Sequence, residues 1–362
     1  MIEDIKDFRR VQMNIGLVGC GRVSRIHMST YKNIPEAKVI AVSDINLRRA
    51  KAFAQEYRIR KVYDDASKLF ELKDLDFVDI CTPTSTHAEL ACEAAKYGHN
   101  ILLEKPMART SKECDQIINE IMKNKVKLCI CHNQLFLPNV MRAKAIVDSG
   151  EFPLAYFKII NRESAELIGA PSWIMTPEHG GALWETGAHS AYLQLHFLEN
   201  IEKVWAIGEK INHPVYDHFV VMLSNPNKTL GIIEISWLAK KVEEIFELID
   251  TNGRKIQILN YGFLLQFPEK VHKNIIQGFY YDQKLITKKW IKFFVDNLRN
   301  RHLLNCLPQY ILITKFIESI KNDEAPPVTP EDGRKTVRLL EYIEEALDKN
   351  EPVKVGGDLA KN

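Results

Sequence analysis

Two glycines near the N-terminus have the spacing of a loop that binds the phosphates of a nucleotide. Residues 19–24 read Gly-Cys-Gly-Arg-Val-Ser, a G-x-G-x-x-S pattern that follows an apolar run and opens a segment with helical periodicity. Glycine at position 19 permits a tight turn, and glycine at position 21 lets the backbone approach a pyrophosphate. The N–H groups and positive dipole end of the helix favour such an anion. The predicted phosphate-binding residues are Gly19, Gly21, Arg22 and Val23.

Asp44 ends the next apolar run, at about the distance from the glycines at which a carboxylate binds the ribose of a dinucleotide. Its charge would repel a 2′-phosphate, which favours NAD over NADP. Arg48 and Arg49 could instead reach back to a phosphate, or they could lie on the exposed face of the next helix. NAD is therefore the predicted cofactor, NADP stays open, and Arg49 is included with Asp44 among the cofactor contacts.

Two polar segments follow later apolar runs. Thr-Pro-Thr-Ser-Thr-His occupies residues 82–87, and Glu-Lys-Pro occupies residues 104–106. Open α/β sheets bind their ligands at the carboxyl ends of parallel strands, which is where both segments would lie. We therefore expect both to face a ligand.

The helices and strands that must position these residues follow two different sequence patterns, one on each side of about residue 150. Up to residue 131, short runs rich in Val, Ile and Leu alternate with helical segments, which predicts a doubly wound parallel sheet. The predicted strands are 14–18, 38–43, 77–81, 100–103 and 127–131, with a weaker one around Val62. The predicted helices are 23–34, 47–57, 66–72, 86–97 and 111–123.

Past residue 151, strands follow one another through turn signals such as Asn252-Gly253, which favours antiparallel pairing. The predicted strands are 155–162, 204–211, 218–224, 229–237, 244–251 and 255–259. The predicted helices are 138–149, 182–198, 287–299, 309–321 and 331–349, and the domain boundary is expected near residues 132–138.

In this order and spacing the motifs are specific, and the chain resembles the Gfo/Idh/MocA oxidoreductase family from Met13 to about Val355. The matching residues are Gly19-x-Gly21, Asp44, Thr82-Pro83 with His87, Glu104-Lys105-Pro106, Gly180-Gly181 leading to Gly187-x-His189, and Pro327-Val328-Thr329 with Glu331-Asp332-Gly333.

The resemblance implies a fold that is α/β plus α+β. Residues 13–133 would form an NAD(P)-binding Rossmann domain with a doubly wound parallel sheet. Residues 134–355 would form a substrate-binding and oligomerisation domain with a large, predominantly antiparallel sheet, one face of which joins a homodimer or homotetramer. The residues implied to line the cofactor are Thr82, Pro83, His87, Glu104, Lys105 and Asn133.

Members of this family carry a helical motif in which an aspartate precedes a histidine by four residues. Glu185 and His189 match it, with glutamate in place of aspartate, and a helix places them one turn apart on one face. Oxidation of a secondary alcohol releases a hydride and a proton, and a histidine with a pKa of about 6.5 can accept that proton.

We expect His189 to act as general acid/base, Lys105 to stabilise alkoxide character or relay the proton, and Glu185 to orient His189 or bind substrate. Lys105 as the proton acceptor is the alternative. The ammonium of Lys105 and the imidazole of His189 are expected to lie close together beside the nicotinamide.

Other side chains are weaker candidates for substrate contacts, because a loop position explains the histidine among them equally well and core packing explains each aromatic better. These are His179, Trp173, Trp184 and Tyr280. Specificity is expected from loops at residues 162–178 and 272–282.

The composition excludes several classes of partner. A net charge of +2 argues against nucleic acid or an anionic membrane, and no run approaches the ~20 apolar residues needed to cross a bilayer. The seven cysteines lack metal-ligand spacing and fit reduced buried thiols, so no metal and a cytoplasmic location are expected.

Three functions fit these residues. The first is a dehydrogenase or reductase acting on the CH–OH group of a sugar, polyol, inositol or nucleotide sugar. The second is an NAD-dependent glycosidase or lyase that acts through transient oxidation. The third is a catalytically silent dinucleotide-binding protein, against which the presence of Lys105, Glu185 and His189 together argues.

Overall fold

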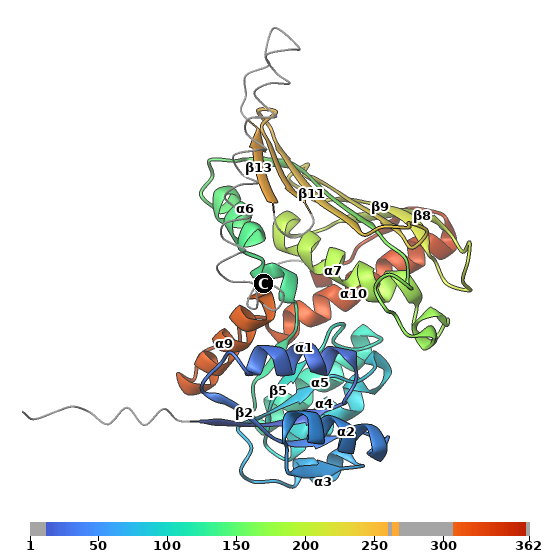
Figure 1. Cartoon of the computed structure of the whole chain (residues 1–362). Helices are drawn as coiled ribbons and strands as arrows, with labels where there is room; N and C mark the ends of the chain where they lie inside the picture. The colour runs from blue at the N-terminus through green and yellow to red at the C-terminus, as the bar shows by residue number, and fades with distance from the viewer. Residues whose placement is uncertain (1–11, 260–262, 268–306, 360–362) are drawn as a thin grey trace, which may run out of the picture. The chain divides into compact units, whose positions relative to one another are not determined.

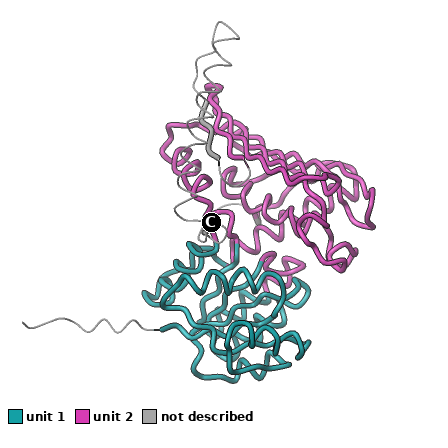
Figure 2. The backbone as a smooth tube through the Cα atoms, in the orientation of Figure 1, with its two compact units in different colours: residues 1–104, 116–131, 309–329 teal, residues 105–115, 132–308, 330–362 magenta. Residues whose placement is uncertain are grey.

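The computed structural model of the chain describes residues 12–259, 263–267 and 307–359 (Figure 1). The chain divides into two compact units (Figure 2). Unit 1 holds residues 1–104, 116–131 and 309–329, and unit 2 holds residues 105–115, 132–308 and 330–362. The predicted domain boundary at residue 133 would place residues 105–115 in the first domain and residues 309–329 in the second. The structure groups residues 105–115 with unit 2 and residues 309–329 with unit 1.

Unit 1 contains a six-stranded sheet in the order β3-β2-β1-β4-β5-β6. All of its strand pairs are parallel. The strands are β1 (Met13–Val18), β2 (Ala37–Ser43), β3 (Lys61–Tyr63), β4 (Phe77–Ile80), β5 (Asn100–Leu103) and β6 (Leu128–Ile130). Strand β4 is buried throughout, as a strand covered on both faces must be. This order is that of a dinucleotide-binding Rossmann domain, so the predicted doubly wound sheet is confirmed.

Helices pack on both sides of this sheet (Figure 1). They are α1 (Arg22–Tyr31), α2 (Leu47–Tyr57), α3 (Ala66–Phe70), α4 (His87–Lys96), α5 (Ser111–Asn124) and α9 (Leu307–Lys321). Helix α9 returns to unit 1 from far along the chain. Its Phe316 ring meets the Phe77 ring edge-on with centroids 5.5 Å apart, and Lys321 pairs with Glu36 at 2.9 Å. Burial of Phe316 thus ties this late helix to the N-terminal sheet.

Unit 2 contains an eight-stranded sheet in the order β13-β12-β11-β7-β10-β9-β8-β14. The strands are β7 (Leu154–Arg162), β8 (Lys203–Glu209), β9 (His218–Ser224), β10 (Leu230–Ser236), β11 (Glu243–Asp250), β12 (Lys255–Leu259), β13 (Phe263–Phe267) and β14 (Val353–Lys354). All pairs are antiparallel except β7 with β10. The predicted, predominantly antiparallel sheet is confirmed.

Three helices lie on one face of this sheet: α6 (Pro138–Asp148), α7 (Gly181–Leu198) and α10 (Pro330–Lys349) (Figure 1). Gly231 on β10 lets α7 approach closely, since a Cβ there would lie 2.4 Å from Gln194 Oε1. The Gln194 amide donates to the carbonyl oxygens of Phe157 (3.2 Å) and Ile232 (3.0 Å). A buried polar side chain thus fixes α7 against two strands.

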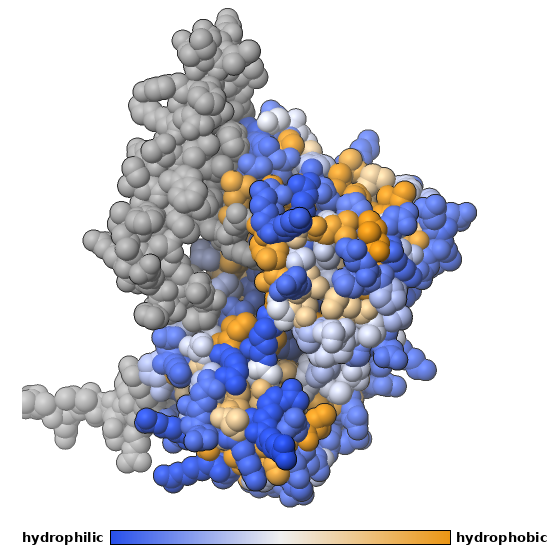
Figure 3. Space-filling view, turned by 45° about the vertical axis from the view of Figure 1, so that its right-hand side comes forward, coloured by the Kyte–Doolittle hydropathy of each residue, from blue (hydrophilic) through white to orange (hydrophobic). Residues whose placement is uncertain are grey.

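The other face of the same sheet carries apolar side chains that face outward. Strand residues alternate between buried and partly exposed, and Ile207 (65% exposed), Met222 (50%) and Leu230 (51%) belong to the outward set. Trp205 pairs with Met222, and Met222 with Ile232, so these side chains form a row across β8, β9 and β10. Hydrophobic patches lie among polar residues in the upper part of Figure 3.

The prediction for residues 309–321 and 331–349 agrees with α9 and α10. Strand β13 was not predicted, because its Phe-Leu-Leu-Gln-Phe sequence shows no alternation. The predicted helix at 287–299, the loop at 272–282 and Tyr280 lie outside the described residues. Of the helices that are described, none combines the length and apolar character that a membrane span requires.

Candidate active site

The loop after β1 has the backbone that the glycine pattern predicts. Gly19 has φ +91°, and a Cβ there would lie 2.6 Å from the carbonyl oxygen of Cys81, so no side chain fits. Gly21 caps α1, and a Cβ there would meet no described atom within 4 Å. Ser24 closes the turn by donating to the Gly21 carbonyl oxygen (2.8 Å). The open space therefore lies at a helix N-terminus, which fits the phosphates of a dinucleotide.

Asp44 follows β2 and is joined to that loop. The Cys20 N–H donates to its Oδ2 (2.9 Å), and the Asn46 N–H donates to its Oδ1 (2.8 Å). Arg49 Nε lies 3.2 Å from Oδ2, and the Arg49 side chain is half exposed. The structure thus brings the predicted residues Asp44 and Arg49 together at one point, with an acidic group for ribose hydroxyls and a basic group beside it. Arg22 is exposed and Val23 is half-buried in the first turn of α1.

The segment after β4 is held by its own side chains. His87 is fully buried, and its Nε2–H donates to the Thr82 carbonyl oxygen (3.0 Å). Thr86 Oγ1 lies 2.8 Å from Thr82 Oγ1. Pro83 is exposed between them. His87 therefore orders the loop from inside, and cofactor contacts by Thr82, Pro83 and His87 remain predictions.

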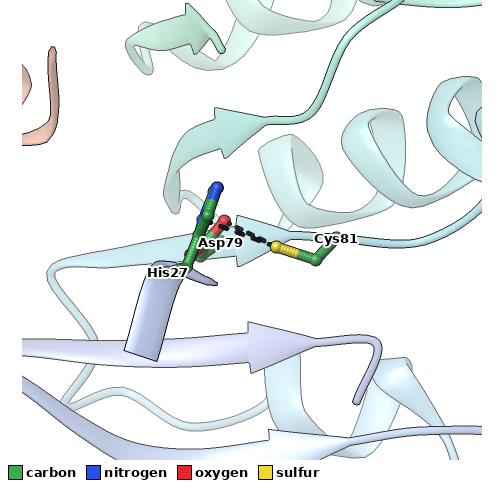
Figure 4. Close-up of side chains that lie close together, drawn as sticks. All are labelled: His27, Asp79 and Cys81. Atoms are coloured by element: carbon green, nitrogen blue, oxygen red, sulfur yellow. Dashed lines mark hydrogen bonds and ion pairs between the residues drawn. The ribbon is translucent and has the colours of Figure 1, made fainter. Parts of the chain in front are cut away.

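Glu104 after β5 belongs to a buried network that the sequence did not reveal. His27 on α1 lies between two carboxylates, with Nδ1 2.8 Å from Asp79 Oδ2 and Nε2 3.0 Å from Glu104 Oε1. Tyr31, one turn later, donates to Asp79 Oδ2 (2.7 Å). Figure 4 shows how His27 of α1 meets Asp79 and Cys81 at the end of β4.

Both ring nitrogens of His27 face carboxylate oxygens, so the ring is best satisfied as an imidazolium that donates twice. Burial opposes that charge, but Asp79 outweighs it together with weaker contributions, and the pKa of His27 rises well above its usual range. The cluster is thus an ion-paired clasp between α1, β4 and β5, which we call the His27 clasp (His27, Tyr31, Asp79, Glu104).

The same neighbourhood includes two sets of potential metal ligands, His27 with Asp79 and Cys81, and His27 with Glu104 and Cys131. To bind a metal, a cysteine must be deprotonated to the thiolate and a histidine ring must be neutral. Burial raises the pKa of the Cys81 and Cys131 thiols, and His27 is held as the cation. The hydrogen bonds of His27 therefore fit a protonated ring, which would not bind a metal, and the absence of a metal stays a prediction.

In unit 2, Lys105 is tied to the start of α7. Its ammonium group lies 3.0 Å from Glu185 Oε2 and donates to the Glu185 carbonyl oxygen (2.9 Å). The Lys105 side chain is only 9% exposed. Gly180 (φ +75°) and Gly181 (φ +57°) form the entry into this helix, where a Cβ on Gly181 would lie 2.3 Å from Val215. Glu185 thus orients Lys105 as well as sharing a helix face with His189.

His189 lies one turn after Glu185 and contacts Tyr192. Its Nδ1 is 2.7 Å from the Tyr192 hydroxyl, which also lies 3.3 Å from Asn133 Oδ1. Burial, the charge of Lys105 and the nearby His132 lower the pKa of His189 well below its usual range. The ring is therefore neutral near pH 7 and can accept a proton. The structure brings Lys105, Glu185, His189 and, through Tyr192, Asn133 together along the stretch of α7 from Glu185 to Tyr192.

Glu163, directly after β7, is a further carboxyl group near this cluster. Its Oε1 accepts from Thr186 Oγ1 (2.6 Å) and from Trp237 Nε1 (3.3 Å). Burial raises the pKa of Glu163, and the Glu185 charge adds to this while Lys105 opposes it. Glu163 was not predicted, because no motif or spacing distinguishes it from the other acidic residues of the chain.

The weaker candidates for substrate contacts differ in how far they are buried. Trp184 is buried, with the Arg109 guanidinium 4.0 Å from its ring centroid and its Nε1 donating to Glu344 (3.3 Å). Packing therefore accounts for Trp184. Trp173 is 41% exposed and meets the His179 ring edge-on at 4.7 Å, so this pair remains available to a ligand.

Comparison with protein families identifies both parts of the chain. Residues 13–132 match the family described as oxidoreductases with an NAD-binding Rossmann fold, and residues 140–255 match the C-terminal domain of the same GFO/IDH/MocA group. The chain belongs to the Gfo/Idh/MocA family. The predicted resemblance and the predicted NAD-binding domain are confirmed.

The relatives and solved structures match this chain over more than half to nearly all of its length. Myo-inositol 2-dehydrogenase of Thermotoga maritima is 26% identical over 351 residues, which is 95% of this chain and 98% of the relative. The NAD(+)-dependent scyllo-inositol 2-dehydrogenase of Bacillus subtilis is 28% identical over 58% of this chain and 60% of its own length. The WlbA dehydrogenase of Bordetella pertussis, solved with NADH and UDP-GlcNAcA, superposes with a TM-score of 0.81 at 17% identity, covering 95% of this chain and 98% of that one.

Proposed function

We propose that this protein is an NAD-dependent oxidoreductase that transfers a hydride between a secondary hydroxyl of a sugar, polyol, inositol or nucleotide sugar and nicotinamide. The observation that carries the proposal is the arrangement at the start of α7. There the ammonium of Lys105, whose side chain is 9% exposed, is paired with Glu185, which lies one helical turn before the neutral imidazole of His189. A protein that only binds a dinucleotide has no need for this pair.

NAD, when bound, supplies a ring that accepts or gives up a hydride. The residues that would hold it are Gly19, Gly21, Arg22, Val23, Asp44, Arg49, Thr82, Pro83, His87, Glu104, Lys105 and Asn133. The open space at Gly21 and the hydrogen-bonded carboxylate of Asp44 support this assignment. Asp44 favours NAD, and use of NADP would depend on Arg49.

The remaining chemistry falls to side chains of unit 2. His189 is neutral at physiological pH, so it accepts the hydroxyl proton as the alcohol is oxidised and returns it in the reverse reaction. Lys105 is held in an ion pair, so it acts as a fixed positive donor towards alkoxide character on the substrate oxygen. Glu185 positions Lys105 through both its carboxylate and its carbonyl oxygen.

The named relatives support the substrate class. The relatives above are dehydrogenases named for inositols, and a similar fold has been solved with a nucleotide sugar. Secondary hydroxyl groups on a ring are common to these compounds.

The test is turnover of NAD by the purified protein with a panel of inositols, sugars, polyols and nucleotide sugars. Replacement of Lys105 by Met keeps the length of the side chain and removes its charge. We expect kcat/KM to fall by about 10² to 10⁴, the range for loss of an acid/base or electrostatic group. Lys123→Met is the matched control, because that side chain is 73% exposed on α5.

Three outcomes would contradict the proposal. Activity of Lys105→Met within tenfold of the unmodified protein would remove Lys105 from the chemistry. Cleavage of a chromogenic glycoside without net NADH would instead identify a glycosidase or lyase acting through transient oxidation. Tight NAD binding with no turnover of any panel member would identify a catalytically silent binding protein.

A further inference from the structure

Tyr192 joins two predicted site residues that are far apart in sequence. It lies on α7, three residues after His189, so both side chains project from neighbouring turns. Its hydroxyl is 2.7 Å from His189 Nδ1 and 3.3 Å from Asn133 Oδ1, and it accepts from the Gln134 N–H (3.1 Å). The Tyr192 ring is buried and stacks on the His132 ring, with centroids 4.3 Å apart and planes at 17°.

The direction of each hydrogen bond follows from the chemistry of a phenol, which has one hydrogen and two lone pairs. The Gln134 N–H can only donate, and the Asn133 carbonyl oxygen can only accept. The hydroxyl hydrogen can go to Asn133 Oδ1 or to an unprotonated Nδ1 of His189, and only the first choice makes a hydrogen bond of all three contacts. The short contact with His189 is then an Nδ1–H that donates to the Tyr192 oxygen, because the hydroxyl has no second hydrogen to give.

The geometry points to Tyr192 as a positioning residue that fixes His189 in the tautomer with hydrogen on Nδ1 and a lone pair on Nε2. The hydrogen bond made by one ring nitrogen of a histidine decides which nitrogen acts on a substrate. Asn133 takes part by holding the hydroxyl hydrogen away from the ring. This inference rests on the proposed function, because a fixed tautomer matters only if His189 transfers a proton.

In the oxidation step, the substrate O–H bond breaks and a new N–H bond forms at Nε2 of His189. The electron pair of that O–H bond becomes the second bond of the new carbonyl group, and the C–H electron pair leaves with the hydride. The imidazolium that results keeps its Nδ1–H bond to Tyr192, so the acceptor oxygen stabilises the new charge. In the opposite tautomer, Nε2 would carry a hydrogen and could not accept another.

The direct test is ¹⁵N NMR of the histidine rings in the full-length protein without cofactor, with His189→Gln used to identify the signals of His189. We expect a protonated Nδ1 and an unprotonated Nε2. Asn133→Asp keeps an acceptor oxygen and should preserve this pattern. Asn133→Ala frees the hydroxyl hydrogen for Nδ1 and should move the proton of His189 to Nε2.

The kinetic test is Tyr192→Phe, which keeps the ring on His132 and removes the hydroxyl. We expect kcat to fall at least about tenfold, the low end for disturbed acid/base catalysis, with KM changed less than about threefold. A residue that only supports the fold would not separate kcat from KM in this way. Tyr216→Phe is the control, since its hydroxyl bonds to Asp348 (3.0 Å), a residue of α10.

The outcomes separate the two proposals. A protonated Nε2 in the unmodified protein, or the same tautomer in Asn133→Ala, would overturn the role of Tyr192 while leaving the dehydrogenase proposal intact. Absence of NAD turnover would overturn the proposed function, whereas the NMR pattern would still report whether Tyr192 and Asn133 set the tautomer. If Tyr192→Phe does not fold, the two Asn133 variants still decide the question.

Discussion

The His27 clasp predicts that one buried histidine contributes much of the stability of unit 1. His27 is 1% exposed and Asp79 is not exposed at all, and the imidazolium also reaches Glu104. Replacing His27 by Leu removes the cation and leaves buried carboxylates facing an apolar side chain. Breaking a buried ion pair from one side costs about 3 to 5 kcal/mol, because the remaining charge is left uncompensated.

That loss corresponds to a fall in Tm of roughly 6 to 20 °C, at about 2 to 4 °C per kcal/mol for a domain of 150 to 250 residues. Part of the cost should vanish when Asp79 is also replaced by Leu, since the uncompensated charge is then gone. We expect the double variant to be less destabilised than the sum of the two single variants by about 1.5 to 3 kcal/mol.

The assay is urea unfolding of the full-length protein followed by circular dichroism, with thermal unfolding alongside. Arg25→Ala is the matched control on the same helix, because the Arg25–Glu56 pair is half exposed on both sides. We expect that control to lose less than about 1 kcal/mol. A protonated His27 ring would not bind a metal, so we expect removal of divalent metal with a chelator to leave the unfolding of the unmodified protein unchanged.

The pH dependence has a definite sign. The pKa of His27 is higher in the folded protein than in the unfolded chain. Its contribution is therefore complete below about pH 6.5 and is lost as the pH rises through the folded pKa, with a slope of up to about 1.4 kcal/mol per pH unit. A loss of less than 1 kcal/mol in His27→Leu, or a difference from the unmodified protein that does not change with pH, would refute the buried imidazolium.

Two further predictions concern cofactor choice and self-association. Asp44→Ala removes the carboxylate next to Arg49, so we expect kcat/KM with NAD to fall roughly ten- to a hundredfold and the preference to move towards NADP; an unchanged NADP/NAD ratio would argue against this pair as the selector. We propose that the outward apolar face of the unit 2 sheet is the interface of a homodimer or homotetramer. The double variant Ile207→Lys, Met222→Glu should then have a lower mass in sedimentation equilibrium, and an unaltered mass would contradict the proposal.

Most secondary structure in unit 1 could be predicted because it depends on local patterns. Buried parallel strands appear in the sequence as short continuous apolar runs. The turn at Gly19 requires a positive φ that favours glycine, and the backbone at Gly21 leaves open space for a ligand. The i, i+4 spacing of Glu185 and His189 likewise fixed their shared helix face, and the structure places Lys105 against the same turn.

The pairing and burial of segments that are far apart in the chain could not be predicted from local patterns. The parallel pairing of β7 with β10 and the return of α9 to the N-terminal sheet depend on contacts between residues far apart in the chain. No local pattern encodes such contacts.

The sequence by itself determined the kind of protein: a dinucleotide loop, a carboxylate for ribose, and a lysine and histidine suited to hydride chemistry on an alcohol. Only the tertiary structure decided the protonation states on which that chemistry depends. His27 becomes a cation because folding encloses it between Asp79 and Glu104, and His189 stays neutral because folding buries it near Lys105. The charge of an imidazole follows from its burial and its neighbours, and neither exists until the chain has folded.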